Sequence, residues 1–168
     1  VNRGYIINSD GNIISKYDKI HMFDIFLDKE THKESDTVKN GNRAVLINTK
    51  HGIIGHTICY DIRFPYLYRK LSQAGAEILM IPAAFTKVTG NAHWHILNRA
   101  RAIENISYVV SPCSIGHIHG GGECYGHSLI IDPWGNVLKD GGEERGIIMA
   151  DIDIKLTKNL RKKLPSLK

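Results

Sequence analysis

Cys59 is the residue of this sequence best placed for covalent chemistry. It follows a short apolar run at residues 53–58, and Pro65 after it opens a stretch at 66–75 that ends in glycine and predicts a helix. A turn between a buried strand and a helix start holds a sulfur outward, and nearby backbone N–H groups can face an oxyanion. The alternative is a buried structural thiol, since free cysteine is among the most buried residue types.

A cysteine nucleophile needs help from its surroundings. A thiol with an ordinary pKa of about 8.5 is only a few per cent ionised near neutral pH, so a cation or a base must lie nearby. Upstream, Lys19 lies within the motif at residues 17–24, and Glu34 lies between that motif and the cysteine. Taken alone, Lys19 would be a solvated lysine and Glu34 a loop carboxylate. Further motifs rich in polar and aromatic residues lie downstream, at 82–86, 89–94, 99–105, 125–128 and 132–135.

In this order, and through nearly all 168 residues, these motifs resemble the nitrilase (carbon–nitrogen hydrolase) superfamily and its Nit-type amidase branch. The resemblance implies that Cys59 is the nucleophile. It implies that Lys19 stabilises the tetrahedral oxyanion together with the backbone N–H of Tyr60. It also makes Glu34 the auxiliary glutamate that orients the lysine and the substrate.

The resemblance also implies a wall of the substrate pocket. Phe85, Thr86, His93 and Trp94 fall where the branch builds that wall, although Trp94 fits a core position equally well. Two residues depart from the pattern of the branch: His95 and Tyr66 both stand where many members have glutamate.

The reaction implied is hydrolysis of a small linear carboxamide, as by an ω-amidase or a deaminated-glutathione amidase, through a cysteine thioester with release of ammonia and without a cofactor. The general-base glutamate of the family belongs to an N-terminal segment upstream of the lysine motif, which residues 1–168 do not include. We therefore expect this chain to be the C-terminal portion of such a protein. The alternative is a catalytically inactive remnant that binds at most a ligand or a partner.

The cysteines and histidines around residue 120 raise a second possibility, a zinc site. Cys113, His117, His119 and Cys124 are suitable ligand types, but their spacing is not that of a standard zinc motif. Residues 120–122 are all glycine, which predicts a loop. We expect no metal there.

Composition limits the other function classes. The net charge of +5 comes from the tail at residues 155–168, which has six basic residues and no acidic ones, so a nucleic-acid-binding face is not favoured. No apolar run approaches the roughly 20 residues that span a bilayer. Three cysteines without a pairing pattern favour a reducing compartment and hence the cytoplasm. The resemblance implies a homodimer or higher oligomer for the complete protein.

Patterning predicts one α/β (α+β) domain over residues 1–168. The resemblance implies a four-layer α-β-β-α sandwich, incomplete at its N-terminus. We expect a helix at 92–105, capped by Asn91, with Ile96, Leu97, Ala100 and Ile103 as its apolar stripe. Residues 28–42 and 114–124 predict loops, and a hairpin should turn at residues 9–11. Further strands are expected at 44–48, 53–58, 78–81, 108–110, 128–131, 136–138 and 146–153, with a basic helix at the end of the chain.

Overall fold

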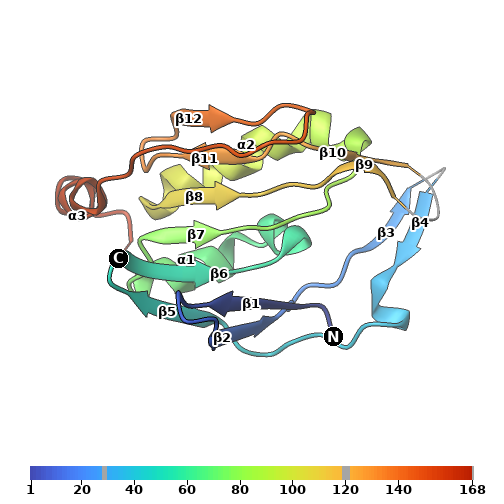
Figure 1. Cartoon of the computed structure of the whole chain (residues 1–168), viewed down its shortest axis with the longest axis horizontal. Helices are drawn as coiled ribbons and strands as arrows, with labels where there is room; N and C mark the ends of the chain where they lie inside the picture. Colours follow the sequence, from blue (N-terminus) through green and yellow to red (C-terminus); the bar gives the residue numbers. More distant parts are fainter. Residues whose placement is uncertain (28–29, 119–121, 168) are drawn as a thin grey trace.

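The computed structural model describes residues 1–27, 30–118 and 122–167. Its centre is a six-stranded mixed sheet in the order β12-β11-β8-β7-β6-β5 (Figure 1). β6, β7 and β8 run parallel, and the other neighbours pair antiparallel. The strands are β5 (Val45–Thr49), β6 (Gly52–His56), β7 (Ile78–Met80), β8 (Tyr108–Ser111), β11 (Leu129–Ile131) and β12 (Val137–Asp140). The α/β class predicted from the sequence is confirmed.

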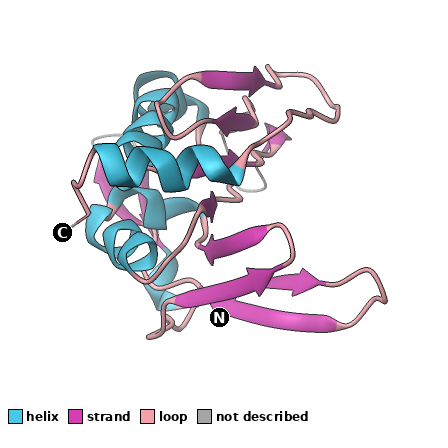
Figure 2. Ribbon diagram, turned by 90° about the vertical axis from the view of Figure 1, so that its left-hand side faces the viewer, coloured by secondary structure: helices cyan, strands magenta, loops and turns pink. Residues whose placement is uncertain are grey.

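Helices α1 (Pro65–Gln73) and α2 (Lys87–Asn105) connect the parallel strands and pack on one face of the sheet, so that the helices gather to one side in Figure 2. The core between these layers is apolar; it includes Leu67, Leu71, Leu79, Trp94, Val109, Leu129 and Ile131. Gly55 in β6 lets α1 approach, because a Cβ there would lie 3.2 Å from side-chain atoms of both Leu71 and Leu79. Of the four layers that the resemblance implies, the described residues therefore build one large sheet and the helical layer on it.

Three two-stranded hairpins surround the sheet. β1 (Arg3–Ile7) and β2 (Ile13–Asp18) form the predicted hairpin. The prediction of a loop at 28–42 is wrong in part: β3 (Asp24–Leu27) pairs with β4 (Glu30–Lys33), and a 3₁₀ turn, Glu34–Asp36, follows. Residues 28 and 29 lie outside the described part. Likewise β9 (Ile115–His117) pairs with β10 (Glu123–Tyr125) inside the expected loop at 114–124, whose residues 119–121 are not described.

Helix α2 differs from its prediction at its start and in the face that it buries. It begins at Lys87 after Thr86, so Asn91 lies inside it and does not cap it. Ile96 is 69% exposed and Ile103 49% exposed, whereas Asn98 and Arg101 are buried. The polar face turns inward because it finds partners: Asn98 accepts from the Ser111 hydroxyl, and Arg101 donates to the Ile62 carbonyl over 2.8 Å.

The C-terminal region holds a second correction. Residues 146–153 form no strand, and Ile147 and Met149 are exposed. Helix α3 (Ile154–Lys163) follows, as predicted, and the Arg161 guanidinium ties it to the body of the chain through the Ile106 carbonyl and the Ser107 hydroxyl. Within the described ranges, the helices are all too short or too polar to cross a bilayer.

Candidate active site

Cys59 begins the 3₁₀ turn Cys59–Arg63, which follows the carboxyl end of β6 after two linking residues. Its φ of 48° lies in the left-handed region, which is uncommon for any residue other than glycine and recurs at functional sites. The Cys59 N–H donates to the Pro82 carbonyl over 2.9 Å. The Thr57 N–H likewise donates to the carbonyl of Met80, the last residue of β7. The cysteine is therefore held at the carboxyl ends of two neighbouring parallel strands, the edge where α/β sheets present ligand sites.

Asp61 fixes this turn against the lysine motif. Its side chain is fully buried and accepts four hydrogen bonds. Oδ2 accepts from the Tyr17 hydroxyl at 2.7 Å and from the Ile58 N–H at 2.9 Å. Oδ1 receives the His21 backbone N–H at 3.1 Å and lies 2.8 Å from Nδ1 of the same residue. One carboxylate thus joins the residues on both sides of Lys19 to the residue before Cys59.

Lys19 lies at the carboxyl end of β2 and is only 2% exposed. Its ammonium forms an ion pair with Glu34 Oε2 at 2.5 Å. The same oxygen accepts from the Phe23 N–H at 2.7 Å, and Oε1 accepts from the Asn2 amide at 3.2 Å. Burial alone would raise the pKa of Glu34, but these hydrogen bonds outweigh it and the pKa is lowered. Glu34 is therefore ionised at neutral pH and fully engaged as an acceptor.

A cavity of about 540 Å³ brings these groups together. Six of the predicted site residues line it: Lys19, Glu34, Cys59, Tyr60, Phe85 and Thr86. The wall is built from segments that follow the three parallel strands: Cys59 after β6, residues 82–86 after β7 and Ser114 after β8. A thiol, an ammonium and backbone N–H groups at the start of a helical turn thus share one solvent-accessible space.

Two other predicted pocket residues stand behind this wall. Trp94 is fully buried; its ring lies 4.9 Å from that of Phe85, and its indole N–H donates to the His127 carbonyl. His93 contacts the Arg63 guanidinium at 3.3 Å without lining the cavity. Both lie on α2, whose first turns pack behind residues 82–86. Phe85 and Arg63, which line the cavity, stand between these two side chains and the space beside Cys59. Neither Trp94 nor His93 is part of the cavity lining, so their contact with substrate stays a prediction.

The surroundings of the thiol oppose its ionisation. Burial raises the pKa of Cys59 above its ordinary value, and the Lys19 ammonium and the hydrogen bond with the Ala84 backbone only partly offset that effect. The resting cysteine is therefore a neutral thiol at pH 7, and attack requires a group that takes its proton.

Sequence reasoning missed several residues of this site. Nothing in the local sequence marked Asp61 as a site residue except its position two residues after Cys59. Its partners Tyr17 and His21 lie 44 and 40 positions away in the sequence. Arg63 and His32 also line the cavity. Arg63 lies over the rings of Tyr60 and Phe85 at 5.7 and 5.3 Å, which places its charge at the aromatic wall.

Among the described residues, the side chains close enough together to hold a metal ion lie outside the cavity. Of the zinc ligands considered from the sequence, His119 lies outside the described residues, and the other three do not line the pocket around Cys59. Over the described part of the chain, the group of histidines and carboxylates close enough to share an ion is His95, His127 and Asp140. It does not line the cavity.

Comparison with known proteins shows the family of this chain. A family model described as carbon–nitrogen hydrolase matches residues 1–162. The deaminated glutathione amidase of Synechocystis is 43% identical over 99% of this chain and 62% of its own length. Omega-amidase NIT3 of Saccharomyces cerevisiae is 37% identical over 98% of this chain and 57% of its own. This chain thus spans about three fifths of the length of these two relatives.

Solved structures extend the agreement to three dimensions. The NitFhit protein of Caenorhabditis elegans superposes on 96% of this chain with a TM-score of 0.90 and 40% identity, and the match covers 40% of that protein. Yeast Nit3, described as a member of branch 10 of the nitrilase superfamily, superposes with a TM-score of 0.85 at 36% identity, covering 97% of this chain and 57% of its own. Because the family model covers almost the whole sequence, this chain belongs to the carbon–nitrogen hydrolase family.

Proposed function

We propose that this chain carries the nucleophile, the oxyanion-stabilising cation and the substrate pocket of an amidase that hydrolyses a small linear carboxamide. The observation that carries the proposal is the meeting of Cys59 and a buried, carboxylate-held Lys19 on one cavity. The names of the relatives, deaminated glutathione amidase and omega-amidase, support the amide as the reacting group.

The reaction begins with attack of the Cys59 sulfur on the carboxamide carbon. The thiol proton passes by way of a base to the amide nitrogen, the carbon–nitrogen bond breaks, and ammonia leaves a thioester on Cys59. Water then adds to the thioester, releasing the carboxylic acid and restoring the thiol. The Lys19 ammonium and the Tyr60 backbone N–H stabilise the negative oxygen of both tetrahedral intermediates.

Glu34 acts in this scheme by holding Lys19. Glu34 is the one carboxylate among the described residues that line the cavity, which would make it a candidate base. It is ionised, however, and already accepts three hydrogen bonds. Using it to take the thiol proton would break the Lys19 ion pair at the moment when the ammonium must face the oxyanion. We therefore assign proton transfer to another group, which by the family resemblance is a glutamate upstream of the lysine motif.

The charge of the cavity favours an amide that also carries a carboxylate. The described residues that line the cavity include three basic side chains, Arg3, Lys19 and Arg63, and one acidic side chain, Glu34. Arg3 is paired with Asp18 outside the wall and Lys19 with Glu34, whereas Arg63 contacts the imidazole of His93. A guanidinium that has no carboxylate partner within the described part of the chain suits a substrate carboxylate, which it can bind through two parallel hydrogen bonds.

The test is ammonia release from succinamic acid by a protein that joins this chain to an upstream segment carrying the proposed base glutamate, compared with the neutral amide butyramide of similar length. We expect release from succinamic acid, weaker release from butyramide, and none from either in Cys59→Ala. Cys124→Ala is the matched control, because Cys124 is a free cysteine that does not line the cavity, and it should keep the wild-type rate. Equal ammonia release by wild type and Cys59→Ala would contradict the proposal and favour the inactive remnant.

A cytoplasmic location and assembly as a homodimer accompany this proposal as predictions from the sequence and the resemblance. The expected molecular partner is the small amide itself. Five of the six basic residues of the C-terminal tail lie on α3, where the exposed Lys158 reaches the carboxylate of Glu77 at 3.5 Å.

A further inference from the structure

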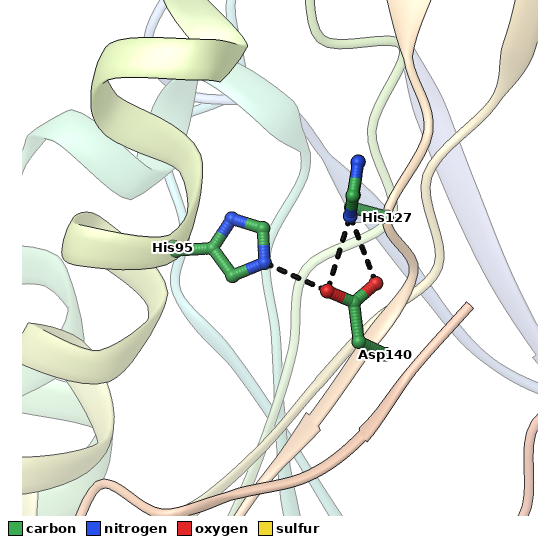
Figure 3. A group of neighbouring side chains, drawn as sticks. All are labelled: His95, His127 and Asp140. Carbon is green, nitrogen blue, oxygen red and sulfur yellow. Dashed lines mark hydrogen bonds and ion pairs between the residues drawn. The ribbon is translucent and has the colours of Figure 1, made fainter. Parts of the chain in front are cut away.

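Three elements bring two histidines and a carboxylate together on the surface away from the active-site cavity. His95 comes from the middle of α2, His127 precedes β11, and Asp140 ends β12. Figure 3 shows the Asp140 carboxylate between the two imidazoles. These residues are separated by up to 45 positions in the sequence, so the tertiary fold alone unites them.

The distances suit a metal ion. His95 Nε2 lies 2.9 Å from Asp140 Oδ2, and His127 Nδ1 lies 3.0 and 3.1 Å from the two carboxylate oxygens. One ligand atom from each residue falls within 4.8 Å of the others. Ligands on a tetrahedral zinc ion, with bonds of about 2.0–2.1 Å, are roughly 3.4 Å apart. Shifts of a few tenths of an ångström at Asp140, with a modest approach of the two imidazoles, would therefore admit an ion.

The backbone holds two of the three ligands in place. His127 has a φ of 53° and its N–H donates to the Gly142 carbonyl at 2.6 Å. Gly126 allows this approach, since a Cβ there would lie 2.8 Å from the same carbonyl oxygen. The Gly142 N–H in turn donates to Asp140 Oδ1 at 2.9 Å. Such outer contacts orient ligands in metal sites.

Neighbouring side chains hold the histidines. The Trp94 indole fixes α2 to the His127 carbonyl one residue before His95. The Tyr125 ring stacks on the His127 imidazole with centroids 4.5 Å apart, and its hydroxyl approaches His95 Nδ1 at 3.5 Å. The non-coordinating side of His95 thus has a polar neighbour, the arrangement that sets the tautomer of a metal-bound histidine.

We propose that His95, His127 and Asp140 form a binding site for a divalent transition-metal ion, with zinc as the best match. Two imidazoles and one carboxylate are a ligand set that zinc accepts, and three protein ligands leave a position for water. The ion would replace the hydrogen atoms that now bridge the imidazoles to Asp140 and would cross-link α2 to the edge of the central sheet. The site is separate from the proposed amide chemistry, since none of its residues lines the cavity around Cys59.

The test titrates the 168-residue chain with zinc chloride by calorimetry and with cobalt chloride by absorption spectroscopy. We expect one zinc ion per chain, bound about tenfold or more weakly by His95→Gln and by Asp140→Asn. His51→Gln is the matched control, because His51 is an exposed histidine outside the cluster, and its affinity should equal that of wild type. The cobalt spectrum should lack thiolate charge-transfer absorption, which distinguishes this site from binding by the three free cysteines.

Thermal unfolding supplies an independent readout. Zinc should raise the Tm of wild type and of His51→Gln and leave that of Asp140→Asn unchanged, since an ion that binds only the folded state stabilises it. Circular dichroism without metal checks that each variant is folded. Absence of stoichiometric zinc binding, unchanged affinity in both cluster variants, or a thiolate cobalt spectrum would overturn the proposal and leave a hydrogen-bonded His–Asp–His cluster.

Discussion

Two carboxylates organise two regions of this molecule in different ways. Asp61 beside the candidate nucleophile and Asp140 on the surface both contact histidine nitrogens, at 2.8 Å and at 2.9–3.1 Å. Each also lies near a non-glycine residue with positive φ, Cys59 in one case and His127 in the other. The Asp61 side chain is fully buried, whereas that of Asp140 is 34% exposed.

That difference in burial sets what each carboxylate can do. Both Asp61 oxygens are saturated by donors of the protein, which suits a fixed scaffold for the turn that carries Cys59. Asp140 faces solvent, so its hydrogen-bond partners can be exchanged for an ion at low cost. Trp94 lies between the two regions, packing on the cavity residue Phe85 and donating to His127.

The largest effect that separates the two regions should come from Asp61→Asn. Asparagine has only one side-chain oxygen. Its NH₂ group would therefore face the N–H or O–H donors that now bond to the second carboxylate oxygen. We expect the free energy of unfolding to fall by about 3 kcal/mol, because buried donors lose their partners. Urea unfolding at neutral pH measures the loss, and Asp151→Asn at an exposed position is the control. A loss below about 1 kcal/mol would show that the Asp61 network is not essential to the fold.

A smaller effect should appear in the reactivity of Cys59. Because burial raises the pKa of this thiol above its ordinary value of about 8.5, its alkylation by iodoacetamide should be slow at neutral pH and accelerate above pH 9. The charge of Lys19 lowers the pKa of Cys59 and partly offsets the effect of burial. Lys19→Met should therefore favour the neutral thiol further and slow alkylation of Cys59 by roughly tenfold at a given pH.

Mass spectrometry of the alkylated peptides follows each cysteine separately. Cys124 is the internal control, because burial alone raises its pKa and Lys19 does not contribute. Its rate should be the same in wild type and in Lys19→Met. Equal Cys59 rates in the two proteins would mean that the ammonium exerts no electrostatic influence on the sulfur, against the site as described.

The smallest effect should be that of Asp140→Asn in metal-free protein. The His95 and His127 contacts are partly exposed, and such pairs contribute only about 0–1 kcal/mol. We expect urea unfolding to show a loss below about 1 kcal/mol, in contrast to Asp61→Asn. A loss as large as that of Asp61→Asn would mean that Asp140 is structural and would remove the distinction between the two regions.

Local signals in the sequence were sufficient for much of the fold. The Asp10-Gly11 turn predicted the first hairpin, and Pro65 marked the start of α1, because turn and cap preferences act within a few residues. The short apolar runs around residues 53–58 and 78–81 predicted strands that are parallel neighbours in the sheet. The placement of Cys59 between strand and helix followed from the same local patterns.

The buried face of α2, the partners that hold the cavity residues in place and the His95 cluster depended on the tertiary structure. Apolar periodicity predicted that Ile96 and Ile103 would be buried, but the inward face carries Asn98 and Arg101, whose partners Ser111 and Ile62 come from other elements. Trp94 had two readings until its neighbours were known. A polar residue is buried where a distant segment supplies a partner for its hydrogen bonds, and a local pattern contains no information about that segment. The sequence by itself therefore determined most elements of the central sheet, the helix α1 and where the thiol lies among them, but it missed the β3–β4 and β9–β10 hairpins and predicted a strand at 146–153 that does not form. Only the folded chain decided which charged and polar side chains meet.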